Sequence, residues 1–431
     1  AEDGIRDTSV TGVQTCALPI YGNPPVGVND TDSVNEDATV TQSSGASLLV
    51  ADDTDADGNS LTVTQIAVTG GSNSAVSSGS TYNSSGTQVT GTYGQLTVGA
   101  DGTYTYVANQ SAADDLDAGD TVTDSFTYTI SDGDATDTAT IIITVTGIND
   151  APVADNETGA VNEDATLTVT DGTSDLLHGD TDADDSASLT VTQIAVTGGS
   201  NSSVASSSSY NSNGTSITGT YGTLVVGADG TYSYIADQSA ADDLDASDTA
   251  TDSFTYTVSD GNGGTSTATI IITVTGVNDA PTASDNTITT NEDTNHVFSV
   301  SEFNFTDVDD SGSLNKIKIT SLEDDGALQY YNGSAWVDVT LNQEITASDI
   351  ASGYLRFKPD ANENGNSYTS FDFKVSDGSA YSSSASTITV NVTPGNDAPN
   401  ASNDTASATE GSSTTVSNPS NGVIDDNDTD P

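Results

Sequence analysis

Short runs in which apolar and polar residues alternate make up most of the chain, and Gly, Asn, Asp and Ser separate them. Along 125–130, Phe126, Tyr128 and Ile130 fall on one face of an extended segment, and the run 140–146 has an isoleucine or valine at every second position. A period of two in β-branched and aromatic residues predicts half-buried antiparallel strands. Further strands are predicted over 61–64, 95–98 and 103–107, with a primed two-residue hairpin turn at Asp101-Gly102 and again at Asp229-Gly230.

This pattern is repeated along the chain. Asn-Glu-Asp begins at Asn35, Asn162 and Asn291, and Asn-Asp-Ala-Pro begins at Asn149, Asn278 and Asn396. Units one and two are close copies, whereas unit three keeps the motifs and changes the interior. We therefore expect tandem units, with bounds at 21–150, 151–279 and 280–398, followed at 399–431 by the truncated start of a fourth unit.

The strands within one unit predict its fold class. Seven or so short strands with turn signals between them are typical of an all-β, immunoglobulin-like sandwich with Greek-key connections. No unit has a helical period, apart from a single possible turn at 112–117. The chain is thus expected to be a linear, monomeric array of β-sandwiches.

The net charge of the chain limits the classes of partner that it can bind. Lys and Arg number 6 against 64 Asp and Glu, a formal net charge of −58, and no Lys or Arg lies between Arg6 and Lys316. Such a chain repels a phosphate backbone, which excludes nucleic acid as a partner. A disordered polyanion is the alternative, and the regular strand pattern argues against it. No apolar run approaches the length of a membrane span.

Residues 1–20 do not resemble the repeats. The stretch from Val10 to Ile20 is similar to the translated read-through of a common sequencing adapter, and it contains the lone cysteine, Cys16. We expect this leader to be non-native and the remaining chain to be an internal segment of a longer protein.

Acidic motifs are expected to meet where consecutive units join, because alternating strands bring the turn after the first strand and the turn before the sixth to the same end of a sandwich. The next unit contributes its linker and its B–C loop. The predicted set at the first junction is Glu36, Asp114, Asp115, Asp117, Asn149, Asp150, Asp180, Asp182 and Asp184. So many uncompensated carboxylates require a cation, and calcium suits six to eight oxygen ligands in flexible geometry better than magnesium does.

The same constellation recurs at the other junctions. The second set is Glu163, Asp242, Asp243, Asp245, Asn278, Asp279, Asp307 and Asp309, and the third is Glu292, Asp360, Glu363, Asn396, Asp397, Asp425, Asp426 and Asp428. Asp53, Asp55 and Asp57 repeat the B–C loop at the start of unit one. The alternative is that these residues only form turns on a solvated face. For Asp132, Asp260 and Asp377 we expect this simpler turn role.

These motifs resemble a known family. The segment from Asp252 to Gly261, the strand run 268–276, the linker from Val277 to Pro281 and the Asn-Glu-Asp turn are similar to the VCBS and cadherin-like repeats of large bacterial surface proteins, including RTX-type adhesins. The resemblance covers residues 21–431 and implies a secreted, calcium-binding stalk that extends an adhesive tip at the cell surface and in biofilms. Unit one departs from it, because Gly22-Asn23-Pro24-Pro25 stands in place of Asn-Asp-Ala-Pro.

The sequence is also compatible with two other functions. Unit three holds Lys316, Lys318, Arg356, Lys358 and Lys374 with the only tryptophan, Trp336, near Tyr330 and Tyr331. These residues favour a glycan- or protein-binding module, unless they are ordinary solvated strand faces.

The sequence gives little support to the hypothesis that the chain is an enzyme. The two histidines, His178 and His296, lie in different units and are expected to be surface or turn residues, and the carboxylates lie in hydrophilic turns. The array could instead be the non-catalytic stalk of a secreted enzyme.

Overall fold

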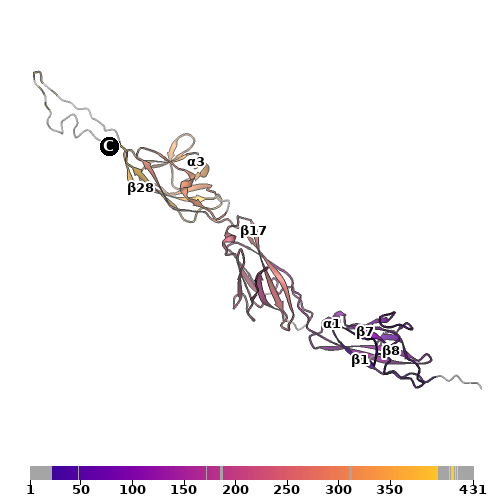
Figure 1. Cartoon of the computed structure of the whole chain (residues 1–431). Helices are drawn as coiled ribbons and strands as arrows, with labels where there is room; N and C mark the ends of the chain where they lie inside the picture. The colour runs from indigo at the N-terminus through magenta and orange to yellow at the C-terminus, as the bar shows by residue number, and fades with distance from the viewer. Residues whose placement is uncertain are drawn as a thin grey trace, which may run out of the picture.

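The computed structural model describes residues 22–46, 48–170, 172–184, 188–309, 313–396, 407, 409–411, 413 and 415. Within these residues the chain forms three β-sandwiches that follow one another in a line (Figure 1). The all-β fold class and the tandem arrangement are therefore confirmed. The adapter-like leader, together with Asp397, Asp425, Asp426 and Asp428 of the third junction, lies outside the described residues.

Domain 1 packs a five-stranded sheet, in the order β1-β9-β8-β3-β4, against a four-stranded sheet, in the order β2-β7-β6-β5. A single helical turn, α1, lies where the sequence predicted one. The bounds are β1 (Asp30–Asn35), β2 (Thr39–Gln42), β3 (Thr62–Val68), β4 (Ser74–Ala75), β5 (Thr87–Thr90), β6 (Gln95–Val98), β7 (Tyr104–Val107), α1 (Ser111–Asp114), β8 (Thr121–Ser131) and β9 (Thr136–Thr146).

Domain 2 repeats this topology, with sheets β10-β18-β17-β12-β13 and β11-β16-β15-β14. Its close sequence match to domain 1 therefore extends to strand order. The bounds are β10 (Glu157–Asn162), β11 (Thr166–Val169), β12 (Thr190–Val196), β13 (Ser202–Ser203), β14 (Thr215–Thr218), β15 (Thr223–Val226), β16 (Tyr232–Ile235), α2 (Ser239–Asp242), β17 (Thr249–Ser259) and β18 (Thr265–Thr275).

Domain 3 keeps the two-sheet plan with different edges. Its sheets are β20-β29-β28-β23-β26 and β21-β27-β24-β25, and β19 pairs with β22 beside them. The bounds are β19 (Thr282–Ala283), β20 (Asn286–Asn291), β21 (His296–Val297), η1 (Val300–Phe303), β22 (Phe305–Thr306), β23 (Lys316–Ser321), β24 (Ala327–Tyr331), β25 (Trp336–Asp338), β26 (Glu344–Thr346), α3 (Ala347–Ala351), β27 (Leu355–Lys358), β28 (Gly365–Ser376) and β29 (Ser386–Thr393).

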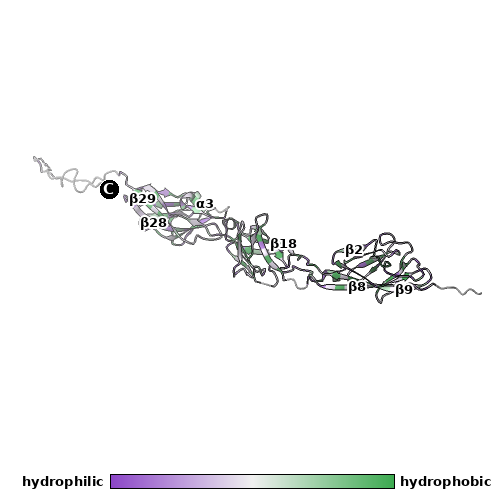
Figure 2. Ribbon diagram, turned by 60° about the horizontal axis from the view of Figure 1, so that its bottom comes forward, coloured by the Kyte–Doolittle hydropathy of each residue, from purple (hydrophilic) through white to green (hydrophobic). Residues whose placement is uncertain are grey.

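The predicted strand faces form the cores. Phe126, Tyr128 and Ile130 of β8 are fully buried, and in β9 Ile141 is fully buried while its neighbour Ile142 is 36% exposed. The β8 and β9 pair is antiparallel, as predicted. Figure 2 shows apolar residues concentrated on the strands of the sandwiches. Burying one face of each strand removes its apolar side chains from water, which is the main stabilising term for each domain.

The hairpin turn at Asp101-Gly102 differs from its prediction. Gly99 and Thr103 are paired, the Gly102 amide donates to the Gly99 carbonyl, and Gly102 alone has positive φ, at +80°. This is a three-residue loop with glycine in the left-handed position rather than a two-residue primed turn. The prediction erred because a primed turn of type I′ needs positive φ at both central residues, and Asp101 does not adopt it.

The first and last strands of domains 1 and 2 pair in parallel, as β20 and β29 do in domain 3. Asp30 pairs with Ile141 and Asn35 with Thr146, and β10 pairs with β18 in the same way. Parallel neighbours end at the same edge of a sheet. The residue after β1, Glu36, therefore lies beside the linker that follows β9, and this pairing positions the junction described below.

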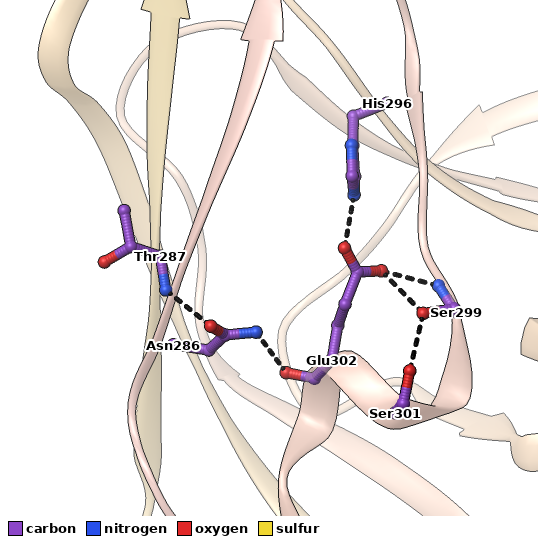
Figure 3. A network of polar contacts seen from close by, with 6 residues as sticks. All are labelled: Asn286, Thr287, His296, Ser299, Ser301 and Glu302. Carbon is purple, nitrogen blue, oxygen red and sulfur yellow. Dashed lines mark hydrogen bonds and ion pairs between the residues drawn. The ribbon is translucent and has the colours of Figure 1, made fainter.

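His178 lies exposed in a turn, as predicted, but His296 does not. It lies on β21, is 20% exposed, and its Nε2 is 3.0 Å from Oε1 of Glu302 (Figure 3). The other carboxylate oxygen of Glu302 accepts the Ser299 amide at the start of η1, which completes a capping box. This polar network orders the first turn of η1, and it lies in a single domain.

Candidate metal centres at the domain junctions

Glu36 is the most buried carboxylate at the junction of domains 1 and 2, with 1% of its surface exposed. One carboxylate oxygen, Oε1, accepts the amide of Ile148 at 2.5 Å. The other, Oε2, is buried and has no hydrogen-bond partner. Burying a carboxylate oxygen without a partner lowers the free energy of unfolding. A bound cation or a proton on this oxygen would remove that penalty.

Domain 2 contributes its B–C loop to the same place. Asp184 is 4% exposed, its Oδ2 accepts the Asp150 amide at 2.9 Å, and its Oδ1 is buried without a partner. Asp182 holds the loop by accepting the Asp184 amide with Oδ1, and its Oδ2 is likewise unpartnered. The alternating aspartates thus direct one oxygen to the backbone and leave the other free, as a cation-binding loop does.

The linker residue Asn149 contacts domain 2 through Asp260, a residue expected only in a turn. Its Nδ2 donates to Asp260 Oδ2 at 2.8 Å and to the Asp150 carbonyl, while its Oδ1 is buried without a partner. Asp260 Oδ1 accepts three backbone amides in the turn after β17, so the predicted turn role holds. The junction role was missed because the two partners lie 111 residues apart in the sequence.

The second junction repeats this geometry. Glu163 is 3% exposed, its Oε1 accepts the Val277 amide, and its Oε2 is unpartnered. Asp309 accepts the Asp279 amide at 3.1 Å, and Asn278 donates to Asp377 at 3.0 Å. A hollow of about 300 Å³ opens here between the two domains, and its lining includes Asp245, Asn278, Asp307, Asp309 and Asp377.

The carboxylates at both junctions affect one another electrostatically. Burial and the neighbouring charges of Asp150 and Asp184 raise the pKa of Glu36. At the second junction, burial and the charges of Asp279 and Asp309 raise the pKa of Glu163. Carboxylates from both sides of each linker are therefore close enough for mutual repulsion, which a shared cation would relieve.

The other predicted ligands differ in how close they lie to the junctions. Asp114 and Asp242 are close enough to the linker aspartates to raise the pKa of Asp150 and Asp279 respectively. Asp115 and Asp243 are exposed, and Asp117 has other interactions. Asp180 lies deeper in domain 2, where its Oδ1 accepts the Asp155 amide at 2.9 Å. Sequence reasoning missed Asp37 and Asp164, whose charges act on the same sites.

The N-terminal end of domain 1 resembles these junctions despite its altered linker. The Asn23 amide donates to Asp57 Oδ2 at 2.6 Å, as the Asp150 amide does to Asp184. Buried oxygens of Asp53, Asp55 and Asp132 have no partner there. The arrangement therefore depends on a backbone amide and on the loop, and it tolerates Gly22-Asn23 in place of Asn-Asp.

The third junction differs within its described residues. Both Glu292 oxygens have partners, because Oε1 accepts the Gly395 amide and Oε2 accepts Asn364 Nδ2 at 3.0 Å. Asp360 Oδ2 accepts the Gly326 amide at 3.2 Å, and Glu363 Oε2 accepts the Tyr368 hydroxyl at 2.7 Å. Asn396 is exposed and has an interaction of its own.

Across the described residues, no three His, Cys, Asp or Glu side chains are already grouped tightly enough to hold a metal ion. The junction carboxylates approach one another without converging, as like charges do. Their donor set of carboxylates and, at the first junction, the Asn149 amide oxygen is chemically suited to a hard cation. The orphaned oxygens of Glu36, Glu163 and Asp184 fit such a group.

The acidic residues Asp30 and Asp53 at the N-terminal end of domain 1 predict that the stability of the protein depends on pH. Burial, with the charges of Asp52 and Asp53, raises the pKa of Asp30 to about 7 against the Tyr128 hydrogen bond, and burial raises that of Asp53 to about 6. Unfolded aspartate titrates near pH ~3.9, so the folded state binds more protons between about pH 4 and 7. Stability of the metal-free protein should therefore fall as pH rises through that window.

We expect the thermal midpoint of calcium-depleted protein to decrease from pH 5 to pH 8, and Asp30→Asn to reduce this slope. Asn can still accept the Tyr128 hydroxyl, which lies 2.7 Å from Asp30 Oδ2. Asp137→Asn is the control, because amide hydrogen bonds from Gly27 and Thr138 lower the pKa of Asp137. Thermal unfolding followed by circular dichroism measures the slope, and a midpoint that rises across this range in the wild type would contradict the prediction.

Comparison with known proteins follows the domain pattern. The bacterial cadherin-like domain model matches residues 22–147 and 149–276, and the bacterial Ig domain model matches residues 278–393. The divergence of unit three thus corresponds to a different family. No similar sequence was found among curated proteins.

Solved structures with a similar arrangement are distant. Mouse cadherin-23 EC22-24 has 15% identity and a TM-score of 0.43, covering 86% of this chain and 99% of its own. Protocadherin gammaB7 EC3-6 has 13% identity and a TM-score of 0.46, covering 89% and 77%. An endo-fucoidan hydrolase of glycoside hydrolase family 107 has 17% identity and a TM-score of 0.21, covering 72% and 38%. No helix in the described part of the chain is long and apolar enough to span a membrane.

Proposed function

On the premise that this chain belongs to the bacterial cadherin-like domain family, which accounts for two of its three sandwiches, we propose that it is a calcium-stiffened extender segment of a secreted bacterial surface adhesin. Calcium binds at the domain junctions and holds neighbouring sandwiches in line. Bacterial cadherin-like and Ig domains are typical of extracellular surface proteins and are typically non-catalytic. The proposal accordingly gives this segment a mechanical role and no reaction of its own.

The observation that carries the proposal is the pair of orphaned glutamate oxygens. Glu36 and Glu163 lie at equivalent positions, each is almost fully buried, and each leaves Oε2 without a partner. Turn formation does not explain them, because the turn hydrogen bonds use backbone groups, such as the Ala38 amide donating to the Asn35 carbonyl. A cation at each site would satisfy the free oxygen and neutralise its neighbours.

The oxygens available at a junction favour calcium over magnesium. They come from loops and a linker, and the side chains that carry them differ in burial. Glu36 supplies one from domain 1, and Asp182 and Asp184 supply others from domain 2. Calcium accepts six to eight such ligands in flexible geometry, whereas magnesium requires a near-octahedral set and releases its water reluctantly. The prediction is thus selective binding of calcium.

A calcium ion shared by two domains would restrict their relative motion. Without it, the Ile148 amide holds the linker to Glu36 of domain 1. The hydrogen bonds that Asn149 and Asp150 make to Asp260 and Asp184 hold the linker to domain 2. Ligands from both domains on one ion would add charge-assisted restraints, and the mutual repulsion of the carboxylates would turn into attraction. Binding to the folded state alone would also stabilise each domain by mass action.

Small-angle scattering on the full chain tests this stiffening. We expect a rod-like profile in calcium, a broader distribution of shapes after chelation, and unchanged strand content by far-ultraviolet circular dichroism. Magnesium at the same concentration is the control cation and should not restore the rod. A profile indifferent to calcium would reject the proposal, and loss of strand content on chelation would assign calcium to folding rather than to the junctions.

A further inference from the structure

One exposed face of domain 3 differs in chemistry from the rest of the molecule. It lies on strands β24, β25 and β27 and on Tyr354, the residue before β27, which is its most exposed member. We refer to the five residues that compose it as the aromatic patch: Gln329, Tyr331, Trp336, Tyr354 and Arg356. On the same strands Leu328, Leu355 and Phe357 are fully buried, so the alternation turns Gln329 and Arg356 to the outer side of the sheet.

The three aromatic rings of the patch form a continuous row. The Tyr331 ring centroid is 5.6 Å from that of Trp336 and 5.4 Å from that of Tyr354. Trp336 and Tyr331 are cross-strand partners on β25 and β24, and Tyr354 is 38% exposed. A row of rings held by strand pairing is a rigid apolar platform at the surface, where aromatic residues are costly unless they contact something.

Arg356 extends this platform with a positive charge. Its guanidinium carbon lies 3.9 Å from the Trp336 ring centroid, and its Nε and Nη2 donate to Gln329 Oε1 at 3.1 and 2.7 Å. Stacking on Trp336 and hydrogen bonds to the neutral amide of Gln329 hold the Arg356 guanidinium in place and leave its positive charge uncompensated. Among the described residues Arg356 forms no ion pair, although the protein has 64 acidic residues and only 6 basic ones.

The corresponding sheet of domain 1 lacks this chemistry. Its outer positions on β5, β6 and β7 include Gln88, Thr97 and Thr105, with Gln88 donating to Gln95 and Thr105 bonded to Thr41. The same two-sheet plan therefore carries a neutral polar face in domain 1 and an aromatic, cationic face in domain 3. A face needed only for folding would not require the difference.

We propose that the aromatic patch binds an acidic polysaccharide. The apolar faces of pyranose rings can stack on the Tyr354, Tyr331 and Trp336 row, and the pre-ordered Arg356 fork can pair with a carboxylate or a sulfate on the sugar. A nucleic acid has aromatic bases as well, but it carries a charge on every residue and would be repelled by a chain of net charge −58. A glycan with fewer charges per sugar than a nucleic acid has per nucleotide is repelled less, and one of its anionic groups can pair with the single guanidinium of Arg356.

Isothermal titration calorimetry on the full chain tests the proposal with hyaluronan, a sparsely substituted dextran sulfate and unmodified dextran, each in calcium and in chelator. We expect binding of at least one of the two anionic polymers over dextran, with the preference separating carboxylate from sulfate recognition. Binding should persist in chelator, because the one carboxylate beside the patch is that of Asp338, whose Oδ1 accepts Gln329 Nε2 at 3.0 Å, and a single carboxylate supplies too few ligands for calcium. Binding that is lost in chelator would assign it to calcium at the junctions and overturn the proposal while leaving the proposed function intact.

Two variants and one control complete the test. Trp336→Ala should weaken binding about tenfold or more, and Arg356→Gln should abolish the preference for the anionic polymer. Thr97→Ala on the matched face of domain 1 should have no effect. If Trp336→Ala unfolds domain 3 by circular dichroism, Arg356→Gln alone decides. Undiminished affinity in Arg356→Gln, absence of anionic polymer binding, or tighter binding of single-stranded DNA would each overturn the proposal.

Discussion

Replacing Asp124 with alanine is expected to destabilise domain 1 by about 4 kcal/mol, the largest effect of any single substitution considered for this chain. Asp124 lies on β8, is 4% exposed, and accepts the amides of Thr92, Tyr93 and Gly94 with the Tyr106 hydroxyl, at 2.7 to 3.1 Å. Alanine leaves the Gly94 amide and the Tyr106 hydroxyl buried without this partner, at a cost of about 1–3 kcal/mol each before relaxation, and it also removes the acceptor of the part-buried Thr92 and Tyr93 amides.

Hydrogen exchange read by mass spectrometry on the full chain measures this effect domain by domain. Amide protection in peptides of β8 and β9 should fall by about 10³-fold, at ~1.4 kcal/mol per tenfold change. Asp252 makes the same four contacts in domain 2, so peptides of β17 and β18 serve as an internal control and should keep their protection. Equal loss in both domains would show that the effect is not local to the Asp124 network.

Replacing Glu163 with glutamine is expected to weaken calcium binding at the second junction by about 100-fold, because ligand charge sets calcium affinity. Glutamine keeps the acceptor that bonds the Val277 amide, so the fold of the linker should persist. What it removes is the charge on the orphaned Oε2. Calcium titration of the full chain should then lose the sites of one junction.

The matched control for this variant is Glu344→Gln. Glu344 is 48% exposed and pairs with Lys316 at 2.8 Å, so the same chemical change there should leave calcium binding unaltered. Glu36→Gln should remove the sites of the first junction instead, and the double variant should remove both. Unchanged calcium stoichiometry in Glu163→Gln would contradict the assignment of Glu163 as a ligand.

The sequence by itself determined the strands and their buried faces. Phe126, Tyr128 and Ile130 could be placed in a core because a period of two is a local property that needs no knowledge of the partner strand. Repetition likewise identified Glu36 and Glu163 as equivalent residues, and it marked the acidic loops before and after each linker. These inferences depend only on residues that are close together in the sequence, so they can be made from the sequence alone.

The tertiary structure decided which of these residues meet. Asp260 and Asp377 belong to junctions because Asn149 and Asn278 reach them across 111 and 99 residues. Both oxygens of Glu292 are instead satisfied by Gly395 and Asn364, which are 103 and 72 residues away in the sequence. Strand pairing likewise joined Trp336 to Tyr331 and turned Tyr330 toward Asp349. Pairing between distant segments depends on the whole packed fold, and for that reason the period of a single strand cannot reveal it.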